Sequence, residues 1–160
     1  MGTEMRLLLD TSILLDYFGK QSTFYMDAVK LRIAASYRDV ELWGTANSLS
    51  DVYYLLQKDH GSKAVQDLFL ANREVLNICS VTSEDIFDSA EEKWSDFENC
   101  LLHTCAKKIR ADYIITLDLD GFIRSTIPCV SPSEFFNDLE EKRGICYSKV
   151  ISELEQELYG

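Results

Sequence analysis

Four aspartates occupy positions where buried strands are expected to end or helices to begin. Asp10 and Asp118 each directly follow a short apolar run, which is typical of a buried strand. Asp51 lies about one turn into the helix expected after a second strand, and Asp96 and Asn99 begin the helix that precedes Asp118. Carboxylate and amide oxygens from separate segments are the ligands that Mg²⁺ and Mn²⁺ prefer. We therefore expect the four aspartates to hold such an ion, with Asn99 as a neutral ligand.

Each of these polar residues also has a simpler interpretation. Asp and Asn often cap helices, and Asp10 could cap the helix that Thr11 begins. For any single residue, capping or solvation is favoured by roughly two to one, so the metal-site prediction depends on several of them meeting at one edge. Thr11, Ser12 and Thr116 are expected to hydrogen-bond a carboxylate or phosphate, although capping also explains Ser12. Asp16 could orient the ligands from behind, or could be a solvated helix position.

The elements that must position these residues alternate along the chain. Short apolar runs at residues 6–9, 40–43, 75–81, 113–116 and 127–130 predict strands, and amphipathic segments between them predict helices. This alternation is typical of a parallel sheet covered by helices on both faces. We expect a three-layer α/β/α fold with four to five parallel strands. In such folds, sites form beyond the carboxyl ends of the strands.

Two segments divide the chain in this interpretation. Residues 1–144 are expected to form the α/β domain. Residues 145–160 are expected to form a charged amphipathic helix that packs on the domain or on a partner, because Val150 and Leu154 are four residues apart. The apolar run at residues 7–18 is interrupted by Asp10 and Asp16, so no membrane-spanning segment is expected.

Charge and cysteine content narrow the function classes. The formal net charge is −11, and a protein that holds nucleic acid by its phosphates would normally present a basic surface. Acidic residues that bind cations weaken this objection, because the metal inverts the local field. The five cysteines are an odd number without a Cys-x-x-Cys motif, which favours reduced thiols and a cytoplasmic protein. Cys100, His103 and Cys105 project in different directions on one expected helix, so we expect no zinc site, and His103 is expected on the exposed side of that helix.

Five segments, in order, resemble the PIN-domain family of ribonucleases and in particular its toxin-type subgroup. Residues 9–16 (LDTSILLD) are similar to the family's opening strand and Asp-Thr-Ser turn. Residues 48–56 (SLSDVYYLL) resemble its second segment, in the subgroup with Asp in place of Glu. Residues 96–106 (DFENCLLHTCA) and 111–122 (ADYIITLDLDGF) resemble the subgroup's Asp-Phe-Glu-Asp helix and its Ala-Asp-x-Ile-Val-Thr strand. Residues 127–135 (IPCVSPSEF) resemble the closing strand and Ser-Pro turn.

The resemblance implies an Mg²⁺- or Mn²⁺-dependent endoribonuclease that cleaves single-stranded RNA. It also implies the toxin of a toxin–antitoxin pair, with an antitoxin protein as partner, and a homodimer. Two residues depart from the family pattern. Asn99 stands where an acid is usual, and Leu117 stands where many relatives have Arg. Asp118, where the subgroup often has Asn, restores the charge that Asn99 removes.

Three functions are consistent with these residues. In the first, Asp10, Asp51, Asp96 and Asp118 hold one or two ions for hydrolysis of a phosphodiester. In the second, Asn99 and the acidic surface mark a PIN-like domain that binds or regulates without catalysis. In the third, a strand-end aspartate is the nucleophile of a phosphoryl transferase, which requires a second aspartate two residues later. Ser12 occupies that position, so this alternative ranks last.

Overall fold

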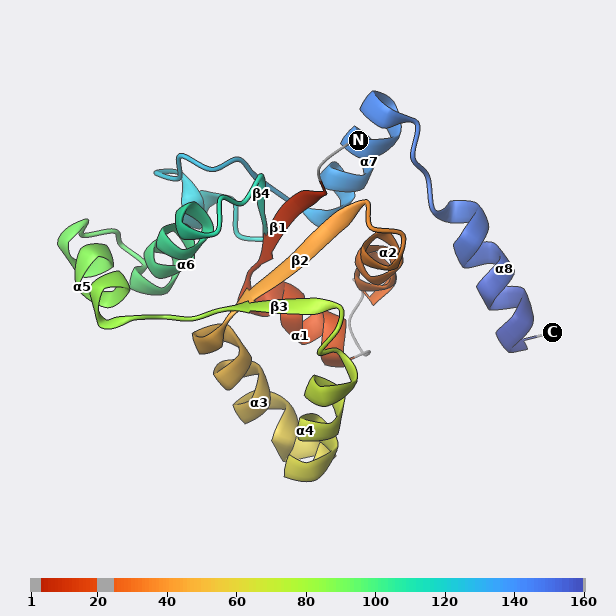
Figure 1. The fold of residues 1–160 in the computed structure, drawn as a ribbon, viewed down its shortest axis with the longest axis horizontal. Helices are drawn as coiled ribbons and strands as arrows, with labels where there is room; N and C mark the ends of the chain where they lie inside the picture. The colour runs from red at the N-terminus through yellow and green to blue at the C-terminus, as the bar shows by residue number, and fades with distance from the viewer. Residues whose placement is uncertain (1–3, 20–24, 160) are drawn as a thin grey trace.

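A central five-stranded parallel sheet organises the chain (Figure 1). The computed structural model describes residues 4–19 and 25–159. The elements are β1 (Met5–Leu9), α1 (Thr11–Gly19), α2 (Tyr25–Ser36), β2 (Val40–Thr45), α3 (Ala46–His60), α4 (Ser62–Ala71), β3 (Leu76–Cys79), α5 (Ser83–Glu91), α6 (Phe97–Lys108), β4 (Tyr113–Ile115), the 3₁₀ helix η1 (Asp120–Phe122), β5 (Cys129–Val130), α7 (Pro132–Arg143) and α8 (Ser148–Tyr159). The strand order is β3-β2-β1-β4-β5, and every neighbouring pair is parallel. The predicted fold class is confirmed.

The sheet separates two apolar layers, because successive side chains of a strand point to opposite faces. Leu7 and Leu9 pack into the larger cluster with α1, α2 and α7. Leu8 and Ile114 pack into the smaller cluster with α6. The three leucines of β1 are fully buried, which is why a central parallel strand reads as a continuous apolar run.

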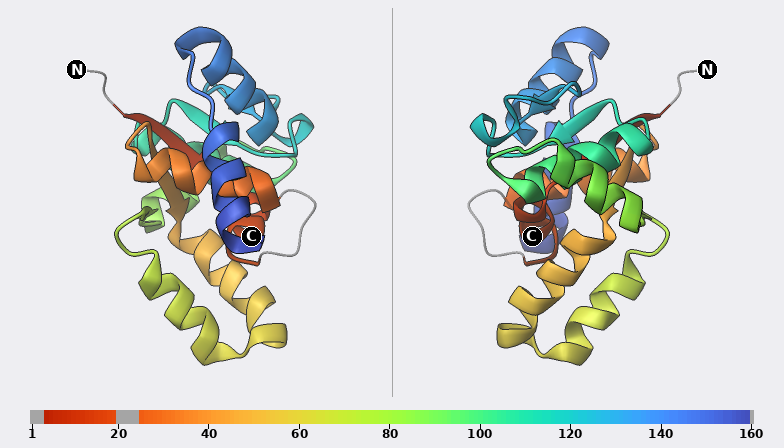
Figure 2. Two further views of the ribbon diagram at one scale, coloured as in Figure 1. Left: turned by 90° about the vertical axis from the view of Figure 1, so that its right-hand side faces the viewer. Right: turned by 90° about the vertical axis from the view of Figure 1, so that its left-hand side faces the viewer.

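Two helical features lie at the periphery of the sheet. Helices α3 and α4 lie side by side and extend away from the sheet, which both views of Figure 2 show. Helix α8 lies at the outer side of α2 (Figures 1 and 2), and Tyr147 and Ile151 at its start are buried in the larger cluster. No helix in the described ranges is both long and apolar enough to cross a membrane.

The cap of α3 is Thr45, whose hydroxyl accepts the Ser48 N–H at 3.0 Å. One local prediction differs from the structure, and it concerns α6. His103 was expected to be exposed but is buried, because α6 is covered on a second side by Trp94 and Phe122.

Candidate metal centre

Asp10 lies at the carboxyl end of the central strand and is 7% exposed. Its backbone N–H donates to the Ile115 carbonyl at 3.1 Å, which continues the pairing of β1 with β4. Its carboxylate accepts the Ser12 hydroxyl at 2.7 Å, the Ile13 N–H at 3.0 Å and the Thr116 hydroxyl. Asp10 therefore caps α1, as its simpler interpretation predicts, and is also held from a second strand. Three donors fix the orientation of this carboxylate.

Thr116 links the two strand-end aspartates. It is fully buried just after β4. Its hydroxyl donates to Asp10 Oδ2 and accepts the Asp118 N–H at 2.9 Å. A single buried side chain thus sets the position of Asp10 relative to the backbone of Asp118, although the two aspartates are far apart in sequence.

Asp118 is exposed and is held from two directions. Asn99 Nδ2 donates to its Oδ2 at 3.1 Å, and the Gly121 N–H donates to its Oδ1 at 3.2 Å. A Cβ atom on Gly121 would lie 2.3 Å from Asp118 Oδ2 and 2.4 Å from Asn99 Nδ2. A side chain at position 121 would therefore push Asn99 and Asp118 apart. Gly121 is not among the site residues expected from the sequence.

Asp96 meets the same cluster through Asn99. As the N-cap of α6, its Oδ1 accepts the Asn99 N–H at 3.1 Å. Asn99 is 9% exposed and its side-chain carbonyl accepts no hydrogen bond from the described residues, so this oxygen is free to bind a cation. The structure therefore joins Asp10, Asp118 and Asp96 in one hydrogen-bonded chain through Thr116 and Asn99.

A second polar group joins the starts of α1 and α3. The Thr11 hydroxyl donates to Ser48 Oγ at 2.9 Å, and the Thr45 hydroxyl donates to the same atom at 3.0 Å. Asp51 follows Ser48 by one turn of α3 and is half-buried, and its carboxylate makes no hydrogen bond or ion pair with the rest of the described chain. Asp16 is half-buried one and a half turns into α1. These contacts bring the starts of α1 and α3 together, but no hydrogen bond links the Asp51 side chain to the group around Asp10.

Among the described residues, the negative charge of this edge has no counter-ion. The ion pairs found in the described ranges involve none of Asp10, Asp96 and Asp118. The same ranges contain no group of three or more His, Cys, Asp or Glu side chains that could hold a metal ion. Mg²⁺ is commonly bound by one or two carboxylates and keeps several waters. Asp10, Asp118 and the Asn99 carbonyl offer oxygens of that kind, so the donor set fits a hard divalent ion.

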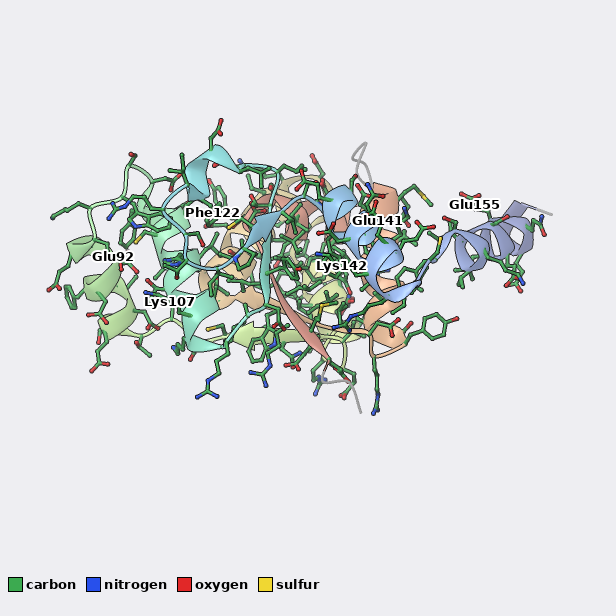
Figure 3. The ribbon with its side chains drawn as sticks, turned by 90° about the horizontal axis from the view of Figure 1, so that it is seen from above. Glu92, Lys107, Phe122, Glu141, Lys142 and Glu155 are labelled. Atoms are coloured by element: carbon green, nitrogen blue, oxygen red, sulfur yellow. The ribbon has the colours of Figure 1, made fainter. Side chains whose placement is uncertain are left out.

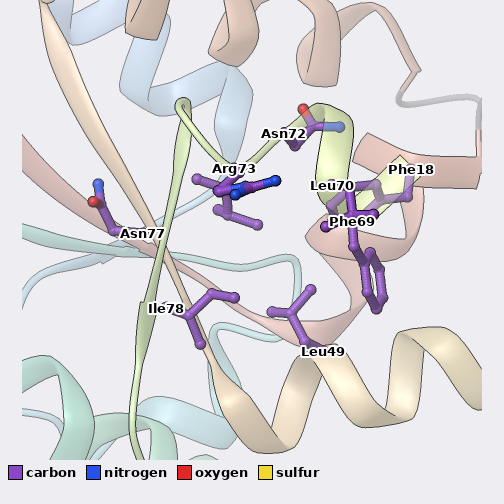
Figure 4. A pocket seen from close by; sticks show the side chains of 9 residues that line it. Phe18, Leu49, Phe69, Leu70, Asn72, Arg73, Asn77 and Ile78 are labelled. Carbon is purple, nitrogen blue, oxygen red and sulfur yellow. The ribbon is translucent and has the colours of Figure 1, made fainter. Parts of the chain in front are cut away.

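An apolar groove of about 570 Å³ lies on another part of the surface (Figure 4). Its walls come from α1, α3, α4 and the edge strand β3, and they include Phe18, Leu49, Phe69, Leu70 and Ile78. None of the predicted site residues lines it. The candidate metal centre is therefore separate from this groove.

Comparison with known proteins identifies the family and the fold. The family model described as PIN domain matches residues 6–120. Among solved structures, VapC20 of Mycobacterium tuberculosis, described as a sarcin-ricin loop cleaving toxin, has a TM-score of 0.57 and 14% identity over 72% of this chain and 92% of its own. VapBC2 of Rickettsia felis, bound to a promoter DNA fragment, has a TM-score of 0.59 and 16% identity over 79% of this chain and 98% of its own.

A toxin–antitoxin complex from Klebsiella pneumoniae has a TM-score of 0.58 and 22% identity over 79% of this chain and 97% of its own. A search of curated proteins finds no match. The structural likenesses show a shared fold, and the family match covers most of the chain. The chain belongs to the PIN-domain family.

Proposed function

We propose that this chain is an endoribonuclease that uses Mg²⁺ or Mn²⁺ to cleave single-stranded RNA. The observation that carries the proposal is the hydrogen-bonded chain from Asp10 through Thr116 to Asp118 and Asn99, whose carboxylates have no counter-ion among the described residues. Carboxylates held rigidly without a cation favour binding of one from solution. Membership of the PIN-domain family supports nuclease chemistry at this edge.

Each site residue has a role that follows from its position. Asp10, Asp118 and the Asn99 carbonyl would hold the ion, and Asp51 and Asp96 would add negative charge near this edge, since the described residues contain no three-acid ligand group. When bound, the ion supplies stabilisation of the charge that develops on the phosphate during hydrolysis. Ser12 and Thr116 keep the Asp10 carboxylate in one orientation by donating to it, so it needs no reorganisation during the reaction. Thr11 fixes the start of α3, from which Asp51 projects.

A direct test compares wild-type protein with Asp10→Asn on an end-labelled RNA without secondary structure. We expect cleavage that requires Mn²⁺ or Mg²⁺, stops with EDTA, and falls at least about 100-fold in the variant, since even the outer partners of metal ligands are worth 10- to 100-fold. Asp59→Asn is the matched control, because Asp59 is exposed near the end of α3. Equal cleavage by wild type and Asp10→Asn would reveal a contaminating nuclease and refute the proposal.

A second candidate is a PIN domain that binds RNA without cleaving it. The neutral Asn99 and the lack of a three-acid cluster in the described ranges favour it. Retention of intact RNA by the wild-type protein in Mn²⁺, with no cleavage products after prolonged incubation, would select this alternative.

We propose further that the nuclease is the toxin of a toxin–antitoxin pair, works in the cytoplasm, and forms a homodimer. Support comes from the fold, because the Klebsiella pneumoniae structure with this fold is described as a toxin–antitoxin complex and the Mycobacterium tuberculosis structure as a toxin. The test is growth arrest on expression of this chain, relieved by co-expression of the product of an adjacent small reading frame. Equal growth with Asp10→Asn and wild type would contradict the toxin assignment. Light scattering of the purified chain decides the dimer.

A further inference from the structure

His103 is a buried histidine whose tautomer the structure determines. It lies one turn after Asn99 in α6 and is 3% exposed. The backbone N–H of Thr126 donates to His103 Nε2 at 3.1 Å, and the Thr126 hydroxyl lies at 3.1 Å from the same nitrogen. A backbone N–H can only donate, so Nε2 must be the unprotonated nitrogen and the ring proton must be on Nδ1. Nδ1 is buried and has no hydrogen-bond partner within the described ranges.

Aromatic contacts hold the ring in place. Trp94 stacks on His103 with ring centroids 5.0 Å apart and an interplanar angle of 27°. The Phe122 ring packs edge-on against the Trp94 ring, with ring centroids 6.5 Å apart. The Arg124 guanidinium lies 5.6 Å from the Trp94 ring and donates to the Glu92 carbonyl at 2.9 Å. We call Trp94, His103 and Thr126 the aromatic clamp.

The aromatic clamp holds the far end of the segment that carries Asp118. At the near end, Asp118 is bound by Asn99 and by the Gly121 N–H. The outward side chains of the segment contribute little packing, since Ile123 is 86% exposed. The segment is therefore attached to α6 through Asn99 at one end and through His103 at the other, with Phe122 buried between them.

The surroundings of His103 keep the ring neutral. Burial lowers the pKa of His103, nearby Lys107 lowers it further, and Glu92 opposes both. Lys107 and Glu92 form an ion pair at 3.8 Å, and Figure 3 shows both on the same side of the molecule as Phe122. A neutral ring keeps the Nε2 lone pair available to Thr126.

We propose that His103 is a positioning residue for the metal centre. By accepting the Thr126 N–H, His103 keeps residues 119–127 in the conformation that presents Asp118 to Asn99. The effect on catalysis rests on the proposed function, whereas the effect on the segment does not. His103 touches none of the proposed ligands through a hydrogen bond. It acts only through the segment it holds.

Hydrogen–deuterium exchange tests the aromatic clamp without reference to activity. His103→Phe keeps an aromatic ring for Trp94 but removes the acceptor, and His103→Gln places an acceptor near the position of Nε2. We expect amide exchange in residues 117–127 to rise about five-fold in His103→Phe, the factor for one net hydrogen bond. In His103→Gln we expect it to return close to the wild-type rate. His60→Phe is the matched control, since His60 is exposed at the end of α3 and its replacement should leave exchange in residues 117–127 unchanged.

RNA cleavage by the same variants then tests the catalytic part. We expect kcat to fall between about 10-fold and 100-fold in His103→Phe with KM unchanged, as for other partners that orient ligands, and to recover in His103→Gln. A merely structural role would instead raise exchange throughout α6, and His103→Gln would not recover. Unchanged exchange in residues 117–127 of His103→Phe overturns the clamp. If the wild type does not cleave RNA but amide exchange in residues 117–127 still rises in His103→Phe, the nuclease proposal is refuted and the aromatic clamp is supported.

Discussion

Adding one methyl group at Gly121 is expected to separate Asn99 from Asp118. The Cβ of Gly121→Ala would lie 2.3 Å from Asp118 Oδ2 and 2.4 Å from Asn99 Nδ2, whereas real Cβ contacts essentially never fall below 3.0 Å. If both atoms retreat directly from the methyl group to 3.0 Å, the triangle of these distances stretches their hydrogen bond from 3.1 Å to about 4 Å. That separation is beyond hydrogen-bonding range. Gly121 has no positive φ, so the substitution acts by sterics alone.

The structure sets different magnitudes for stability and for activity. Asp118 is exposed and can rotate into solvent, so we expect a loss of about 1 kcal/mol in the free energy of unfolding, the net value of one hydrogen bond. A shift of roughly 1 Å in a catalytic group can cost about 100-fold in rate. Gly121→Ala should therefore be a folded protein with much less cleavage and weaker Mn²⁺ binding.

Three measurements on Gly121→Ala separate these effects. Urea unfolding gives the stability, the Asn99 side-chain amide resonance reports the broken hydrogen bond, and cleavage of labelled RNA gives the rate. Gly19→Ala is the matched control, because its Cβ would meet Leu56 at an ordinary 3.5 Å, and we expect no loss in it. A wild-type cleavage rate and Mn²⁺ affinity in Gly121→Ala, together with a shifted Asn99 resonance, would refute the role of the Asn99–Asp118 contact.

The remaining predictions concern the bridge, a helix start and the metal. Thr116→Val should lower the free energy of unfolding by about 2 kcal/mol in urea, because its buried hydroxyl makes two hydrogen bonds; Thr116→Ser should recover most of it, and an equal loss in both would argue against the bridge. Lys108 and a backbone N–H lower the pKa of Asp85 from 3.8, so its stabilisation is present at neutral pH and is lost as the pH falls through the folded-state pKa. Asp85→Asn should cost about 1 kcal/mol at pH 7 and nothing in acid, and a pH-independent cost would contradict this. Asn99→Asp should lower the melting temperature in EDTA, because it faces Asp118, and Mn²⁺ should raise it more than in the wild type; equal shifts would count against ligand oxygens here.

The central strands and their parallel direction were predictable because burial on both faces leaves a local signal in the sequence. A strand buried on both faces must be apolar throughout, so β1 and β4 stand out in the sequence, and the residues after them are placed at one edge by the parallel direction alone. The ends of strands were less predictable. The strand expected to begin at Ile127 is confined to Cys129 and Val130, because Pro128 has no N–H to donate to a neighbour.

The features that could not be predicted from the sequence depend on contacts between distant segments. His103 is buried because Trp94 and the loop that carries Thr126 cover a side of α6 that a helical periodicity shows as polar. The need for glycine at position 121 depends on how closely Asn99 approaches Asp118, which no spacing reveals. Asp96 is a helix cap in the structure, as statistics favour, and whether it also binds a metal stays a prediction.

The pairing of β1 with β4 has a consequence for the chain during synthesis. Asp10 is made early, but its partners Ile115 and Thr116 lie more than 100 residues later in the chain. A nascent chain that has emerged only through α5 carries one half of the acidic edge and none of the strand that completes it. On our proposal, a nascent chain therefore becomes active only when most of it has left the ribosomal exit tunnel.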